Sequence, residues 1–115
     1  MAKYMVLYRS SISATDQMAN SDPEAAKAGM ELWMKWAGRV GGAMADMGSP
    51  LGTVVTVTAS GSTAGSAGGS FIGGFSVLEA DSVESVKKLL DDHPHFHMPG
   101  DPSIEVLEFL PVLGT

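Results

Sequence analysis

The two ends of the chain are rich in apolar residues of the kinds that form β-strands. Residues 3–9, KYMVLYR, are rich in aromatic, branched and long apolar side chains, which favour a strand. Side chains two residues apart share a face of a strand. Both faces of this first strand are therefore apolar. Residues 103–110, SIEVLEFL, show a similar pattern and predict the last strand.

A helical period begins after a polar connector, residues 10–22, in which no period is sustained. Asp22 followed by Pro23 is a typical helix start, because the aspartate accepts hydrogen bonds from free amides and proline has no amide to satisfy. Steps of three and four residues then form one apolar stripe of an amphipathic helix: Ala26, Met30, Trp33, Ala37 and Val40. Gly41 and Gly42 predict its end with a left-handed cap.

The middle of the chain predicts two further strands and a second helix. Turn residues 48–50 lead into TVVTVT, residues 53–58, whose β-branched side chains predict a strand. Residues 59–70, rich in glycine and serine, predict a mobile hairpin loop. FIGGFSVLEA, residues 71–80, predicts another strand, with a bulge or a close backbone approach at Gly73 and Gly74.

The second helix is expected to start at a capping-box variant formed by Asp81 and Glu84 and to stop before Pro94. The order strand–helix–strand, strand–helix–strand predicts an α+β, ferredoxin-like βαββαβ fold, with a four-stranded antiparallel sheet and two helices on one face. Two helices cover only one face of such a sheet, and the other face is apolar too. We therefore expect a homodimer formed sheet to sheet.

Composition narrows the functional classes. The 115 residues suit a single domain, 1–115, and the formal net charge of −6 argues against nucleic acid or an anionic membrane as a partner. The absence of cysteine excludes disulfides, thiolate metal sites and a cysteine nucleophile. No signal peptide or membrane-spanning run is apparent, so we expect a cytoplasmic protein.

Four stretches resemble the YCII-related family, including its DGPF branch: KYMVLY, GGAMADMGSPL, GGFSVLEADSVESVKKLLDDHPHF and SIEVLEFLPV. The resemblance implies a ferredoxin-like fold that pairs into a dimeric α+β barrel. A few members are implicated in lyase, dehalogenase or isomerase chemistry on small, often ring-derived, acids. The segment that names the DGPF branch is absent here. The family's suspected dyad pairs a histidine on the first helix with an aspartate before a proline. Glu31 or Trp33 lies nearest the first place, and His93 occupies the second.

The segment DDHPHFHMPGD, residues 91–101, holds all three histidines at alternate positions and allows three interpretations. The histidines could converge on a metal ion, but one irregular segment seldom supplies every ligand, and we predict neither a metal site nor a cofactor. They could be a polar helix end and loop surface. Alternatively, His93 and then His95 are the best candidates for a general acid or base in a pocket, with Phe96 in the core and His97 at the surface.

Two further residues are candidates for substrate binding. Arg9 could hold an anionic group, although a surface pair with an acid is the commoner role of such a residue. We expect Trp33 in the core and Trp36 as a pocket wall. The first hypothesis is a lyase- or isomerase-type enzyme that uses histidine acid–base chemistry on a small organic acid. The second is a non-catalytic dimeric module that binds a small ligand.

Overall fold

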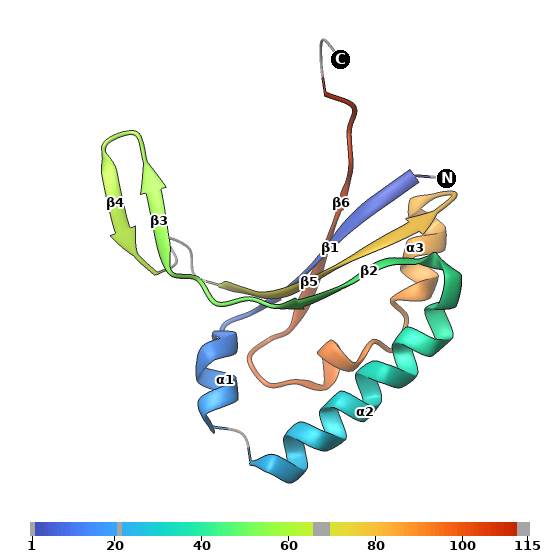
Figure 1. The fold of residues 1–115 in the computed structure, drawn as a ribbon, viewed down its shortest axis with the longest axis horizontal. Helices are drawn as coiled ribbons and strands as arrows, with labels where there is room; N and C mark the ends of the chain where they lie inside the picture. The colour runs from blue at the N-terminus through green and yellow to red at the C-terminus, as the bar shows by residue number, and fades with distance from the viewer. Residues whose placement is uncertain (1, 21, 66–69, 113–115) are drawn as a thin grey trace.

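A four-stranded antiparallel sheet forms the centre of the fold, in the order β2–β5–β1–β6 (Figure 1). The strands are β1 (Ala2–Ser10), β2 (Met44–Pro50), β5 (Phe71–Ala80) and β6 (Ser103–Glu108). The computed structural model describes residues 2–20, 22–65 and 70–112. The α+β class and the four-stranded antiparallel sheet are confirmed, and the arrangement is compatible with a ferredoxin-like fold.

The core lies on one face of this sheet. Tyr4, Val6 and Tyr8 of β1 alternate with residues that are only partly buried, and they pack with Leu78 and Ala80 of β5. The helices α2 (Pro23–Val40) and α3 (Val83–Leu89) cover this face. Their contribution to the same cluster consists of Trp36, Val40, Val86 and the adjoining Leu90.

The start of α2 is confirmed. The Asp22 side chain accepts a hydrogen bond from the amide of Ala25 at 2.8 Å, and Pro23 is the first helical residue. The helix ends at Gly41, as predicted, with φ 58° and ψ −125°, which is outside the left-handed helical region. A 3-10 turn, η1 (Gly41–Ala43), then leads into β2.

Two helix predictions need correction. The polar connector contains a short helix, α1 (Ala14–Asn20), in which the Ser13 hydroxyl accepts from the amide of Asp16 at 3.1 Å. The second predicted helix is capped by Ser82 rather than by Asp81, because the Ser82 hydroxyl accepts from the amide of Ser85. After α3, a 3-10 turn, η2 (Pro94–His97), carries His95 and His97, and His93 is the residue directly before it.

The second strand of the main sheet is not the one predicted. TVVTVT supplies only β3 (Val55–Thr58), which pairs with β4 (Gly61–Ala64) in a separate two-stranded sheet. β4 lies in the segment predicted to be a loop, of which residues 66–69 are outside the described part of the chain. The place in the main sheet is taken by β2, which pairs with β5 through two register shifts. The predicted bulge is confirmed, because the β1–β5 register skips Gly73.

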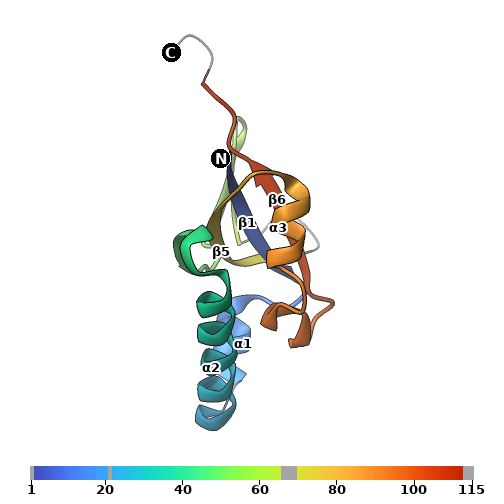
Figure 2. The ribbon, with the colours of Figure 1, turned by 90° about the vertical axis from the view of Figure 1, so that its right-hand side faces the viewer.

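The chain is more extended than its length requires. The radius of gyration is 15.5 Å, against about 13 Å for a compact domain of this size. The β3–β4 hairpin stands away from the main sheet (Figure 1), and residues 109–112, after β6, continue beyond the body of the fold (Figure 2). Val54, Val57 and Leu110 in these two projections are each more than 70% exposed.

Candidate functional site

A cavity of about 690 Å³ lies at one end of the sheet, between α1, the first half of α2 and the loop after η2. The sheet contributes parts of β1, β2 and β5. Most of the wall is apolar. The larger apolar and aromatic residues that line it are Tyr8, Ile12, Met18, Met30, Trp33, Met47, Phe75 and Met98. A volume of this size is in the range of small-molecule sites.

His95 is the histidine that lines this cavity, and its ring orientation is fixed. Its Nε2 lies 2.8 Å from the carbonyl oxygen of Arg9 and 3.1 Å from that of Ser103. Carbonyl oxygens only accept, so Nε2 carries a hydrogen and donates to both. In the neutral ring Nδ1 is then an acceptor, and the described residues show no hydrogen bond to it. His95 is 7% exposed. Its Nδ1 is not one of the described side-chain atoms that are fully buried and lack a hydrogen-bond partner.

His93 lies two residues away in a closed environment. Its side chain is 0% exposed and does not line the cavity. The rings of Tyr8, Trp33 and Trp36 surround it, with centroids 4.2–4.9 Å from its own. Burial, together with His95 and Arg39 nearby, lowers the pKa of His93 to about 3. Near neutral pH it is therefore an uncharged part of the core.

The hydrogen bonds of His93 explain its position. Its Nδ1 accepts from the backbone amide of His95 at 2.9 Å and caps the start of η2. Its Nε2 is buried and has no hydrogen-bond partner among the described residues. The neutral ring carries its hydrogen on this atom, which is enclosed by aromatic rings. The expectation that His93 lines a cavity is thus not met.

Tyr8 separates the closed cluster from the cavity. Its hydroxyl is 2.8 Å from that of Ser76, which donates to the carbonyl oxygen of Met47 at 2.9 Å. Since the Ser76 hydrogen is used there, Tyr8 is the donor in the first bond. Burial raises the pKa of Tyr8 to about 12, partly offset by the bond with Ser76. The Tyr8 side chain is therefore uncharged near neutral pH, and its hydrogen bond to Ser76 fixes its position in the wall of the cavity.

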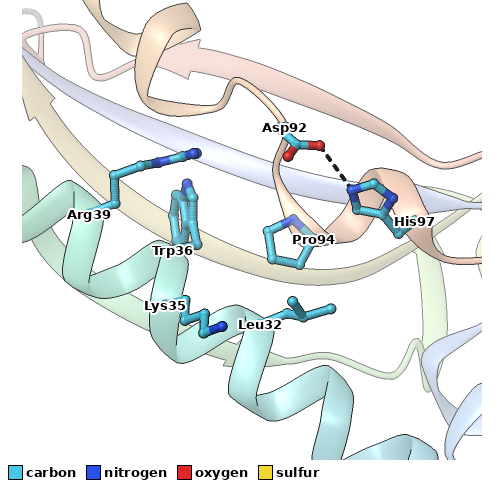
Figure 3. A pocket seen from close by; sticks show the side chains of 7 residues that line it. All are labelled: Leu32, Lys35, Trp36, Arg39, Asp92, Pro94 and His97. Carbon is cyan, nitrogen blue, oxygen red and sulfur yellow. Dashed lines mark hydrogen bonds and ion pairs between the residues drawn. The ribbon is translucent and has the colours of Figure 1, made fainter.

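The two tryptophans exchange their expected places relative to the large cavity. Trp36, expected as a pocket wall, is 3% exposed, and its Nε1 donates to the carbonyl oxygen of Leu89 at 2.8 Å. Trp33, expected in the core, is half-buried and lines the large cavity. Trp36 does border a second pocket of about 220 Å³ on the other side of α2 (Figure 3).

This smaller pocket holds the basic residues of the region. Lys35 and Arg39 of α2 line it together with Asp92 and His97, and these last two are joined by a hydrogen bond of 3.0 Å (Figure 3). Arg39 donates to the carbonyl oxygens of Leu89 and Asp91, and so satisfies the end of α3. The surface position predicted for His97 is confirmed, whereas Phe96, predicted in the core, is 47% exposed. The pocket is thus an open surface feature.

Arg9 takes the surface role. Its guanidinium lies 3.4 Å from a carboxylate oxygen of Glu105 and donates to the hydroxyl of Ser70. It lines neither pocket. The structure therefore brings His95 to the large cavity and leaves His93, Arg9 and Trp36 outside its wall. Within the described residues no group of His, Asp and Glu side chains could hold a metal ion.

The sequence predictions missed the contributions of α1 and β2. Asp16, Gln17 and Met18 of α1 line the cavity, together with residues 47–50 of β2. One signal for α1 was present: Ser13 followed three residues later by Asp16 resembles a capping box. No comparable signal marks residues 47–50, which contain glycine, serine and proline.

Comparison with known proteins does not assign the chain to a family. The chain matches no protein-family model and has no significant match to a curated protein. The described helices include none long and apolar enough to cross a membrane.

Proposed function

We propose that this protein binds a small organic molecule in the 690 Å³ cavity, with His95 as the main polar contact. The observation that carries the proposal is the locked ring of His95. Two backbone carbonyls hold its Nε2–H, so Nδ1 is the ring atom left for a ligand. A mostly apolar cavity with few oriented polar groups is typical of small-molecule sites.

Acid–base catalysis of lyase or isomerase type is the second candidate. It is favoured by a specific juxtaposition, since Asp16 of α1 lines the same cavity as His95. A proton-transfer enzyme needs a base and a second group that returns the proton. In this version His95 would act through Nδ1 and Asp16 would be the partner. His93 would act only by positioning His95, because its Nδ1 accepts from the His95 amide.

Methionine methyl groups provide a direct test of binding. Met18, Met30, Met47 and Met98 line the cavity, whereas Met5 and Met34 do not. A fragment screen read by methyl NMR should therefore shift the first four signals and leave the other two in place. Hits that shift Met5 or Met34 alone would contradict the proposal, as would the absence of any hit.

A matched pair of glycines tests the location. Gly29 and Gly38 are both in α2, and a Cβ added at either would meet nothing within 4 Å. Gly29 lines the cavity and Gly38 does not. Gly29→Leu should abolish fragment binding and Gly38→Leu should leave it unchanged, while both retain the fold, since leucine is the better helix former. Equal binding by the two variants would place the site elsewhere.

We also propose that the protein is a homodimer of the YCII-related type, paired sheet to sheet. The face opposite the helices is apolar across neighbouring strands, because Met5 pairs with Val77 on one side and with Leu107 on the other. Extended apolar surface of this kind marks an interface. Light scattering should give twice the chain mass of 11.9 kDa. Val77→Lys should yield monomers, and Val83→Lys on α3 should not.

A further inference from the structure

The cavity differs in charge from the smaller pocket behind α2. Among the described residues that line it, Asp16 is a carboxylate and no lysine or arginine is present. Three basic side chains of β1 and α2 make their contacts outside the cavity. Arg9 pairs with Glu105, and Lys35 and Arg39 line the smaller pocket. An anion in the cavity would lose its hydration without gaining a cationic partner, which is costly.

Most hydrogen-bond donors of the cavity side chains are already used, and the exception is the indole N–H of Trp33, which has no hydrogen-bond partner among the described residues. The Tyr8 hydroxyl donates to Ser76, and the Ser49 hydroxyl to the carbonyl oxygen of Pro50. The Ser10 hydroxyl donates to the carbonyl oxygens of Pro99 and Gly100.

The Gln17 amide nitrogen donates to the Ser10 hydroxyl oxygen and to the carbonyl oxygen of Ile12. His95 uses its Nε2–H on two further carbonyls. Apart from Trp33, the polar side chains therefore offer acceptors to a ligand, and one of these acceptors is Nδ1 of His95.

The apolar wall suits a ring. The Trp33 and Tyr8 rings meet edge to face, with centroids 4.9 Å apart, and four methionines complete the lining. Methionine side chains adapt their shape and make favourable contacts with aromatic rings through sulfur. These residues would accommodate a flat ligand without fixing its outline closely.

From these observations we infer that the ligand is an uncharged, ring-containing molecule with an N–H or O–H group that donates to Nδ1 of His95. This inference rests on the proposed function and narrows it. A small organic acid, which the resemblance to the YCII-related family implies as substrate, would meet no cation in the described wall. A hydrogen-bond acceptor without a donor would leave Nδ1 of His95 unpaired.

Two isomers isolate the donor. Skatole and N-methylindole have the same size, but only skatole keeps the ring N–H. Indole carboxylate and tryptamine add a negative and a positive charge to the same ring. Calorimetry should give skatole an affinity roughly fivefold above that of N-methylindole, since a net hydrogen bond is worth that order of free energy. Both charged probes should bind more weakly than skatole.

The variant His95→Gln tests which atom accepts. Its amide nitrogen can replace Nε2 as donor to the carbonyls of Arg9 and Ser103, and its one acceptor, the amide oxygen, is then displaced from the position of Nδ1. The preference for skatole should fall to about one, with His97→Gln as the exposed control. Thermal unfolding of each variant reports whether the fold is kept.

The outcomes separate the two claims. Probes that shift the four cavity methionines without preferring skatole, or with a charged probe binding tightest, overturn the inference and leave the proposed binding function standing. If no probe shifts those methionines, both fail. The isomer comparison on the wild-type protein decides the matter even if His95→Gln does not fold.

Discussion

His93 directly precedes η2 and His95 lies within it, and the two histidines have opposite environments. His93 is enclosed by three aromatic rings and its pKa is lowered to about 3. His95 is held by carbonyls of β1 and of the residue that opens β6, and it lines the cavity. The closed cluster is part of the core, whereas the open cavity is the proposed binding site. Residue type alone thus decides neither role, because burial and hydrogen-bond partners set the chemistry of each ring.

The largest expected difference concerns packing. Trp36→Ala removes a buried ring and the hydrogen bond to Leu89, and it should lower the free energy of unfolding by about 3–5 kcal/mol. Met30→Ala, on the cavity side, removes a side chain that is 58% exposed and should cost less than about 1 kcal/mol. Urea titrations of both variants measure this contrast. Similar losses would break the distinction between a closed cluster and an open cavity.

The second difference is in pH dependence. The folded-state pKa of His93 is about 3, and the ordinary value is 6.5. Between these values the unfolded chain binds the proton and the folded chain does not. Stability is therefore complete above about pH 6.5 and falls as the pH drops toward 3. The loss from His93 between pH 7 and pH 4 should be about 3 kcal/mol.

Urea titrations at several pH values can isolate this term. The variant His93→Gln keeps an acceptor for the His95 amide and removes the titration, so its stability should depend on pH less steeply than that of the wild type. His97→Gln, at an exposed position, serves as the control and should keep the wild-type slope. Parallel curves for wild type and His93→Gln would show that the His93 environment is not closed.

The smallest expected effect concerns Tyr8, which lies between the closed cluster around His93 and the cavity. Tyr8→Phe keeps the ring between them and removes the hydroxyl that donates to Ser76. Ser76 retains its own bond to the carbonyl oxygen of Met47. The variant should lose about 1 kcal/mol of stability, with fragment affinity in the cavity unchanged. A large fall in affinity would mean that the phenol itself contacts the ligand.

Elements with a strong local pattern could be predicted from the sequence. The alternation in β1, β5 and β6 and the stripe in α2 identify four elements, and Asp22–Pro23 and Gly41 give the ends of α2. The bulge at Gly73 was also predictable, because two adjacent glycines inside a strand pattern indicate an irregular or closely approached backbone.

Local pattern could not predict that β2, rather than β3, joins the main sheet. Residues 55–58 have the higher strand propensity and form a separate hairpin, while Met44–Pro50 joins the edge of the main sheet. Gly48 has φ 83°, and a Cβ there would lie 1.5 Å from the carbonyl oxygen of Phe75. The glycine that resembles a turn residue thus permits a close approach to β5. Pairing with a neighbouring strand decides such cases, because strand propensity depends on context.

The sequence by itself determined the α+β class, the order of most elements and the concentration of histidines near residue 95, since these follow from local periodicity and composition. Only the tertiary structure decided which histidine is sealed and which lines the cavity. Alternate positions were expected to share a face, but the residues after His93 form a 3-10 turn rather than an extended segment. That turn and the surrounding rings direct the two side chains into different environments, and contacts distant in sequence set their chemistry.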